Sequence, residues 1–140
     1  MQFLRRDIGL LLPALAAGRS FGQSKALPSA AIRFEDLKVR DNGKSRARSV
    51  LNGETHSGYA VEMHITELDS GASPHPPHKH VHEEVMCVQR GLLDVTVNGK
   101  QARLTPGSVF YVHSNDEHGV ENPGPEKVQY FVIALGGDNV

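Results

Sequence analysis

The feature that most constrains the fold of this chain is an alternation of apolar and polar side chains that recurs after residue 30. The segment 59–68 reads YAVEMHITEL, in which every second residue from Tyr59 to Ile65 is apolar. This period of two predicts a half-buried β-strand. The same alternation occupies 92–97 and is followed by Asn98-Gly99, a pair that strongly indicates a two-residue hairpin turn.

Two more strands are expected at 108–112 and 127–135, and Gly- and Pro-rich turns separate the strands. No segment after residue 30 has a convincing helical period. Many short strands without helices predict an all-β fold, which is a sandwich, a jelly roll or a small barrel. The very apolar segment 127–135 is expected to be an edge strand, and dimerisation would cover such an edge.

The first 27 residues have the pattern of an export signal, which leaves 28–140 as a single domain. Arg5 and Arg6 precede a mostly apolar stretch, 8–17, that is too short to span a membrane. The paired arginines indicate the twin-arginine route and a periplasmic or other extracytoplasmic location. An amino-terminal helix that belongs to the fold remains the alternative. Three cleavage ends stay open, namely Ala17, Ala26 and Ala30.

Charge and cysteine content exclude several classes of function. The chain carries a net charge of -1. Without residues 1–27, eleven basic and fifteen acidic residues remain, which argues against a nucleic-acid partner. No apolar run is long enough for a membrane span. The single cysteine, Cys87, cannot form an intrachain disulfide and is expected to be a small buried apolar residue.

A cluster of histidines between the predicted strands 59–68 and 92–97 contains the residues that are best suited to chemistry. His78, His80 and Glu84 are separated by even numbers of residues, so on an extended strand they share one face. Two imidazoles and a carboxylate suit a first-row divalent metal. The same parity admits His82 and excludes Glu83.

These residues resemble the first motif of the cupin superfamily, in which a glycine is followed by H-x-H, a glutamate and a second glycine. The matching positions are Gly71, His78, His80, Glu84 and Gly91. A frame that pairs His80 with His82 fails, because no glutamate stands four or five residues after His82.

The second cupin motif is matched in its ligand and its spacing, although its turn differs. Gly107, His118 and Asn122 stand where the motif has them, while His113 replaces the usual proline and Asn115 the usual glycine. Asparagine tolerates the left-handed conformation that such a turn requires. His113 is not expected to be a ligand.

The resemblance implies one cupin-type antiparallel β-barrel, also described as a double-stranded β-helix or jelly roll, that pairs into a homodimer. It also implies one divalent transition metal per chain, which is iron, manganese, zinc, nickel or copper. The implied ligands are His78, His80, Glu84 and His118.

The resemblance does not identify one reaction, because the fold hosts many chemistries. Three imidazoles and one carboxylate leave coordination positions open for a small molecule or oxygen. The expected function is therefore a metal-dependent enzyme, of dioxygenase, isomerase or lyase type, that acts on a small oxygen-rich ligand. The alternative is a noncatalytic extracytoplasmic binding protein for a small ligand or metal. No catalytic residue is assigned; His82 is either an acid-base or supporting group near the metal, or an exposed turn residue.

Overall fold

The computed structural model describes residues 26–137, so the predicted export signal lies outside the described range except for Ala26 and Leu27. Within that range the chain forms nine β-strands and one short 3-10 helix, η1 (Phe34–Asp36). No helix in this part of the chain is long and apolar enough to cross a membrane. Leu27 donates its backbone N–H to the carbonyl of Glu54, 2.8 Å away, so the first described residues already pack on a strand.

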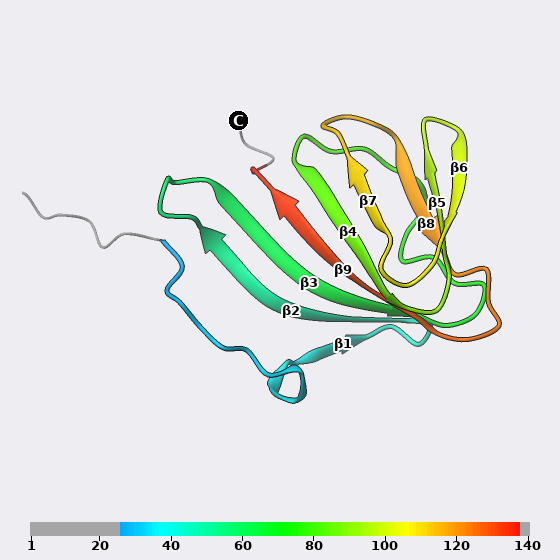
Figure 1. The fold of residues 1–140 in the computed structure, drawn as a ribbon, viewed down its shortest axis with the longest axis horizontal. Helices are drawn as coiled ribbons and strands as arrows, with labels where there is room; N and C mark the ends of the chain where they lie inside the picture. The colour runs from blue at the N-terminus through cyan, green and yellow to red at the C-terminus, as the bar shows by residue number, and fades with distance from the viewer. Residues whose placement is uncertain (1–25, 138–140) are drawn as a thin grey trace, which may run out of the picture.

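The strands form two antiparallel sheets that face each other as an all-β jelly-roll barrel (Figure 1). The larger sheet has the order β1-β2-β3-β9-β4-β7, and the smaller has the order β6-β5-β8. The predicted fold class is therefore confirmed. The strand bounds are β1 (Val39–Asp41), β2 (Ser45–Glu54), β3 (Ala60–Leu68), β4 (Glu83–Arg90), β5 (Leu93–Val97), β6 (Lys100–Leu104), β7 (Val109–Val112), β8 (His118–Glu121) and β9 (Val128–Leu135).

Strand β9 is not an edge strand, which corrects the expectation for 127–135. It lies between β3 and β4 and is hydrogen-bonded to both of them along its length. The larger sheet ends instead at β1 and β7. The apolar composition of β9 fits its surroundings on both faces, because Tyr130 and Val132 belong to the core while Phe131 lies on the outer face beside Phe34.

The alternation in β3 is present, but its polar face is the one that points into the barrel. His64 and Thr66 lie on the interior face and line a cavity, while Met63 and Ile65 lie on the outer face of the sheet. The apolar residues of this strand therefore do not mark the face that points into the barrel, because that face lines a partly polar cavity.

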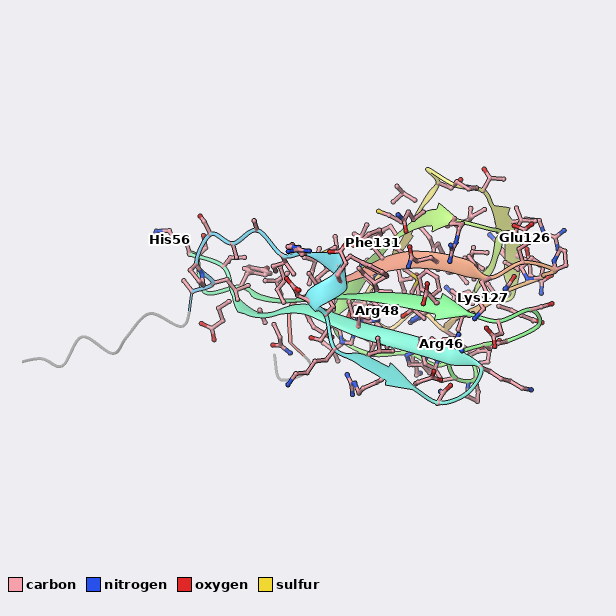
Figure 2. The ribbon with its side chains drawn as sticks, turned by 90° about the horizontal axis from the view of Figure 1, so that it is seen from below. Arg46, Arg48, His56, Glu126, Lys127 and Phe131 are labelled. Carbon is pink, nitrogen blue, oxygen red and sulfur yellow. The ribbon has the colours of Figure 1, made fainter. Side chains whose placement is uncertain are left out.

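The outer face of the larger sheet is covered by the segment that contains η1. The guanidinium of Arg48 lies over the ring of Phe34, with its Cζ atom 4.6 Å from the ring centre. Figure 2 views this side and labels Arg46 and Arg48 on β2 and Phe131 on β9. Arg48 also donates to Glu67 across the sheet at 2.9 Å, so this side chain is held from two directions.

The apolar core takes side chains from both sheets. It consists of Leu68, Ala72, Met86, Val88, Leu93, Val95, Val120, Val128, Tyr130 and Val132. The predicted hairpin turn between β5 and β6 is confirmed. Asn98 and Gly99 have φ values of 47° and 79°, the positive values of a type I′ turn.

Candidate metal centre and its cavity

The histidine cluster is assembled by two strands and by the loop that precedes β4. Glu84 lies on β4, His118 is the first residue of β8, and His78 joins the loop to β8. The backbones of His78 and His118 exchange two hydrogen bonds of 2.9 Å each. The continuous strand expected from His78 to Glu84 is not formed, because β4 begins only at Glu83. The side chains converge because the loop is pinned to β8, not through strand parity alone.

The loop is pinned at a second point by the turn before β8. Asn115 donates its backbone N–H to the carbonyl of His80, 2.8 Å away. Asn115 has a φ of 64°, the left-handed conformation that was expected where asparagine replaces glycine. The altered turn of the second motif therefore still helps to position His80 of the first motif.

Backbone carbonyls fix which ring nitrogen of two histidines is free. The Nδ1 atom of His80 lies 2.8 Å from the carbonyl of His82, and that of His118 lies 2.9 Å from the carbonyl of Asp116. A carbonyl can only accept, so Nδ1 carries a proton in both histidines, and in the neutral ring the lone pair is then on Nε2. Metal-binding histidines are held in this way by an acceptor on the second nitrogen.

Three buried ring nitrogens have no hydrogen-bond partner among the described residues: Nδ1 of His78 and Nε2 of His80 and His118. A buried polar atom without a partner is costly and calls for an explanation. One ligand atom from each of these histidines lies within 4.8 Å of the others. A metal ion bound among them would supply the missing partner, so the residues present fit a metal.

Glu84 completes this group on the side of β4. Its Oε1 lies 3.5 Å from Nε2 of His80, and its Oε2 lies 3.4 Å from Nε2 of His118. Ligands held about 2.1 Å from one ion at tetrahedral or octahedral angles are about 3.0 to 3.4 Å apart, so these separations are close to those of a coordination shell. The structure thus brings the four predicted residues into one cluster. Their role as metal ligands remains a prediction.

The two other histidines near the cluster are placed differently. His82 packs its ring on that of His80, with centroids 3.5 Å apart and planes at 8°, and its Nε2 lies 3.4 Å from Oε1 of Glu84. It forms a second group of three with His80 and Glu84. His113 is exposed and lies in neither group.

Burial lowers the pKa of His78 below its usual value, and the imidazoles of His75, His118 and His80 lower it further, against the opposing charge of Glu84. The neutral ring is therefore favoured at this position. Neutral imidazole is the form that binds a metal ion.

A cavity of about 410 Å³ opens beside Glu84 and His118, on the interior face of the larger sheet. It is large enough for a small organic ligand. Its lining combines apolar residues with polar ones that come from β1, β2, β3, β4, β8, β9 and the loop before β4: Arg40, Asp41, Asn42, Ser45, Ala47, His64, Thr66, Pro74, His75, Glu84, Met86, His118, Gly119, Val120, Tyr130 and Val132.

Strand β3 contributes a histidine to the lining of the same cavity, and this histidine is paired with a carboxylate. Nδ1 of His64 lies 3.3 Å from Oε1 of Glu62. Burial raises the pKa of the nearby Tyr130, which keeps its hydroxyl neutral and hydrogen-bonded with Thr66. The sequence reasoning did not assign these residues to a site. The available signal was the polar face of the half-buried strand, formed by Glu62, His64 and Thr66.

Comparison with known proteins agrees with this architecture. Residues 64–134, just over half of the chain, match the family model described as a cupin domain. The chain is 27% identical over 89 residues to L-ectoine synthase of Halomonas elongata, covering 63% of this chain and 64% of that enzyme. The matched region therefore spans less than two thirds of that relative.

Solved structures of low sequence identity share the fold. An RmlC-like cupin from Shewanella frigidimarina has a TM-score of 0.65 at 24% identity and covers 79% of this chain and 95% of its own. KdgF from Halomonas sp. has a TM-score of 0.66 at 20% identity, and the match covers 80% of this chain and 98% of KdgF. A protein of Thermotoga maritima described as a predicted oxalate decarboxylase has a TM-score of 0.65 at 19% identity. The match covers 77% of this chain and 100% of that protein's chain.

Proposed function

Because this chain belongs to the cupin family, we propose that it is a metal-dependent enzyme that acts on a small oxygen-rich molecule in the cavity beside His118. The observation that carries the proposal is the set of three buried ring nitrogens without a partner, next to a carboxylate and a cavity. We propose His78, His80, Glu84 and His118 as the ligands of one divalent transition metal. Bound there, such an ion supplies Lewis-acid or one-electron chemistry.

The residues around the cavity have separate tasks in this proposal. His64, oriented by Glu62, is the group placed to accept or donate a proton, since Nδ1 is engaged and Nε2 remains for the ligand. Met86 and Val132 line the same cavity and exclude water from that part of its wall.

The matched relatives support an enzyme over a binding protein, without identifying the reaction. The curated relative is a synthase, and one structural neighbour is described as a predicted oxalate decarboxylase. Neither activity is assigned to this chain, because the same fold hosts unrelated reactions.

Purification from the native compartment followed by metal analysis and turnover assays tests the proposal. We expect about one transition metal per chain, and conversion of an enediol, catechol or sugar derivative that depends on the metal. Oxygen consumption identifies the dioxygenase type. A protein that retains a small ligand tightly without turnover would instead be the noncatalytic binding protein, and a protein without stoichiometric metal would contradict the proposal.

We also propose that the protein acts outside the cytoplasm, because of the export pattern in residues 1–27. We propose cleavage after Ala17 or Ala26 over cleavage after Ala30, because cleavage after Ala30 would remove Leu27 and its backbone hydrogen bond to Glu54. Intact-mass measurement on exported protein tests this. Recovery of only the full-length chain from the cytoplasm would overturn it.

A further inference from the structure

Arg40 on β1 stands out from the other arginines of the described chain. Residues 26–137 contain six arginines, and five of them form an ion pair with an aspartate or glutamate. Arg40 has no carboxylate partner among the described residues, although the next residue is Asp41. That carboxylate is occupied by the N–H of Gly43 at 2.7 Å and by Arg46 at 2.9 Å.

The register of the larger sheet places Arg40 on the interior face. It lies opposite Ala47, which lies opposite Thr66, which in turn lies opposite Tyr130. Directly opposed residues share one face of a sheet, and both Thr66 and Tyr130 are buried inside the barrel. The small side chain of Ala47 leaves room for the long side chain of Arg40 above β2, and Arg40 lines the cavity.

Arg40 and Glu84 line the same cavity from strands that are far apart in the larger sheet. Three strands, β2, β3 and β9, separate β1 from β4, which carries Glu84, and the sheet curves between them (Figure 1). A ligand that reaches from the cluster towards β1 passes His64 on β3 and meets Arg40 at the rim. Of the carboxylates that line the cavity, Asp41 is already paired and Glu84 belongs to the cluster.

We propose that Arg40 binds a carboxylate of the ligand, so that the substrate class is a small organic acid whose other oxygens face the histidine cluster. This inference rests on the proposed function, since it assigns a substrate class to the same site. A guanidinium presents a planar pair of donors that matches a carboxylate in two parallel hydrogen bonds. Unpaired arginine at a cavity rim also attracts an anionic ligand from solution.

Paired ligands that differ only in the carboxylate test the inference: 3,4-dihydroxybenzoate and catechol. Their affinities for metal-loaded protein are measured by calorimetry in wild type, Arg40→Gln and Arg33→Gln. Arg33 pairs with Glu35 and Asp36 and does not line the cavity, so its variant is a control for the loss of one positive charge. We expect Arg40→Gln to weaken the binding of 3,4-dihydroxybenzoate about tenfold and to leave the affinity for catechol unchanged. Arg33→Gln is expected to change neither affinity.

The possible failures are distinct. Wild-type protein that holds no metal contradicts the proposed function. Metal-loaded protein that binds neither ligand, that binds both equally, or that keeps its preference for the carboxylate in Arg40→Gln overturns the inference about Arg40. Thermal melting of each variant identifies any change caused by misfolding, and Arg40→Lys, which keeps the charge, is expected to restore part of the preference.

Discussion

Asn122 illustrates how a single residue of the second cupin motif supports the histidine cluster without belonging to it. Its side chain is fully buried, with 0% exposure, and it donates to the carbonyls of Leu68 at 3.0 Å and Glu126 at 2.7 Å. It also accepts from the N–H of Gly124 at 2.8 Å. The amide therefore ties the end of β3 to the turn before β9, directly after the strand that carries His118.

We expect Asn122→Ala to lower the free energy of unfolding by about 2 to 4 kcal/mol, because it leaves buried backbone groups without partners. Asn52→Ala, at an exposed position of β2, is the control and is expected to change stability by less than about 0.5 kcal/mol. Chemical denaturation measures both. Equal stability of the two variants would show that the buried amide has no such structural role.

At the scale of elements, the turn after β4 depends on a close approach to the start of β9. Gly91 has a φ of 75°, and a Cβ atom there would lie 2.6 Å from the carbonyl oxygen of Lys127 and 2.9 Å from Cα of Val128. Those are backbone atoms at the point where β9 begins, and they cannot move aside alone. Gly58 has a similar φ of 80° with nothing within 4 Å.

The two glycines form a matched pair for substitution by alanine. Gly58→Ala is expected to cost about 1 kcal/mol, the penalty of the left-handed conformation alone. Gly91→Ala is expected to cost about 3 kcal/mol or more, because a backbone clash is added. Thermal or chemical unfolding compares them, and equal costs would mean that the turn and β9 can separate freely.

Strand positions also explain what could be predicted from the sequence. Period-two alternation and Asn98-Gly99 were sufficient to predict the fold class. The spacing of the two motifs was sufficient to predict that His118 joins the residues of the first motif. The central place of β9 could not be predicted, since an apolar run fits either an exposed edge awaiting a partner or a buried centre. Arg40 was missed because the three residues of β1 are too few to have a period and gain their face only from pairing with β2.

At the scale of the whole molecule, the expected homodimer remains a prediction. The strand that would pair is no longer 127–135, because that segment lies inside the sheet, whereas β7 is at an edge. The edge strand β7 carries Val109 and Tyr111 on the outer face, with exposures of 60% and 53%. Exposed apolar residues on a sheet edge favour pairing with a second copy. We expect a dimer by light scattering, and Val109→Lys to weaken it, whereas Val39→Lys on the opposite edge does not. A monomeric wild type at micromolar concentration would contradict this.

The central claim, that four residues bind one metal ion, depends on a histidine far from the cluster in sequence. His118 is 2% exposed, has its Nδ1 engaged, and is the only one of the four from β8. Loss of a ligand should abolish stoichiometric binding, whereas loss of a supporting group such as His82 typically weakens binding ~10- to 100-fold.

Metal content per chain in wild type, His118→Ala, His82→Ala and His113→Ala tests the claim most directly. We predict about one ion per chain in wild type and in His113→Ala, most of that content in His82→Ala, and none in His118→Ala, with circular dichroism confirming that every variant is folded. If folded His118→Ala keeps its metal while His82→Ala loses it, the ion is held by the histidine cluster alone and the assignment is wrong.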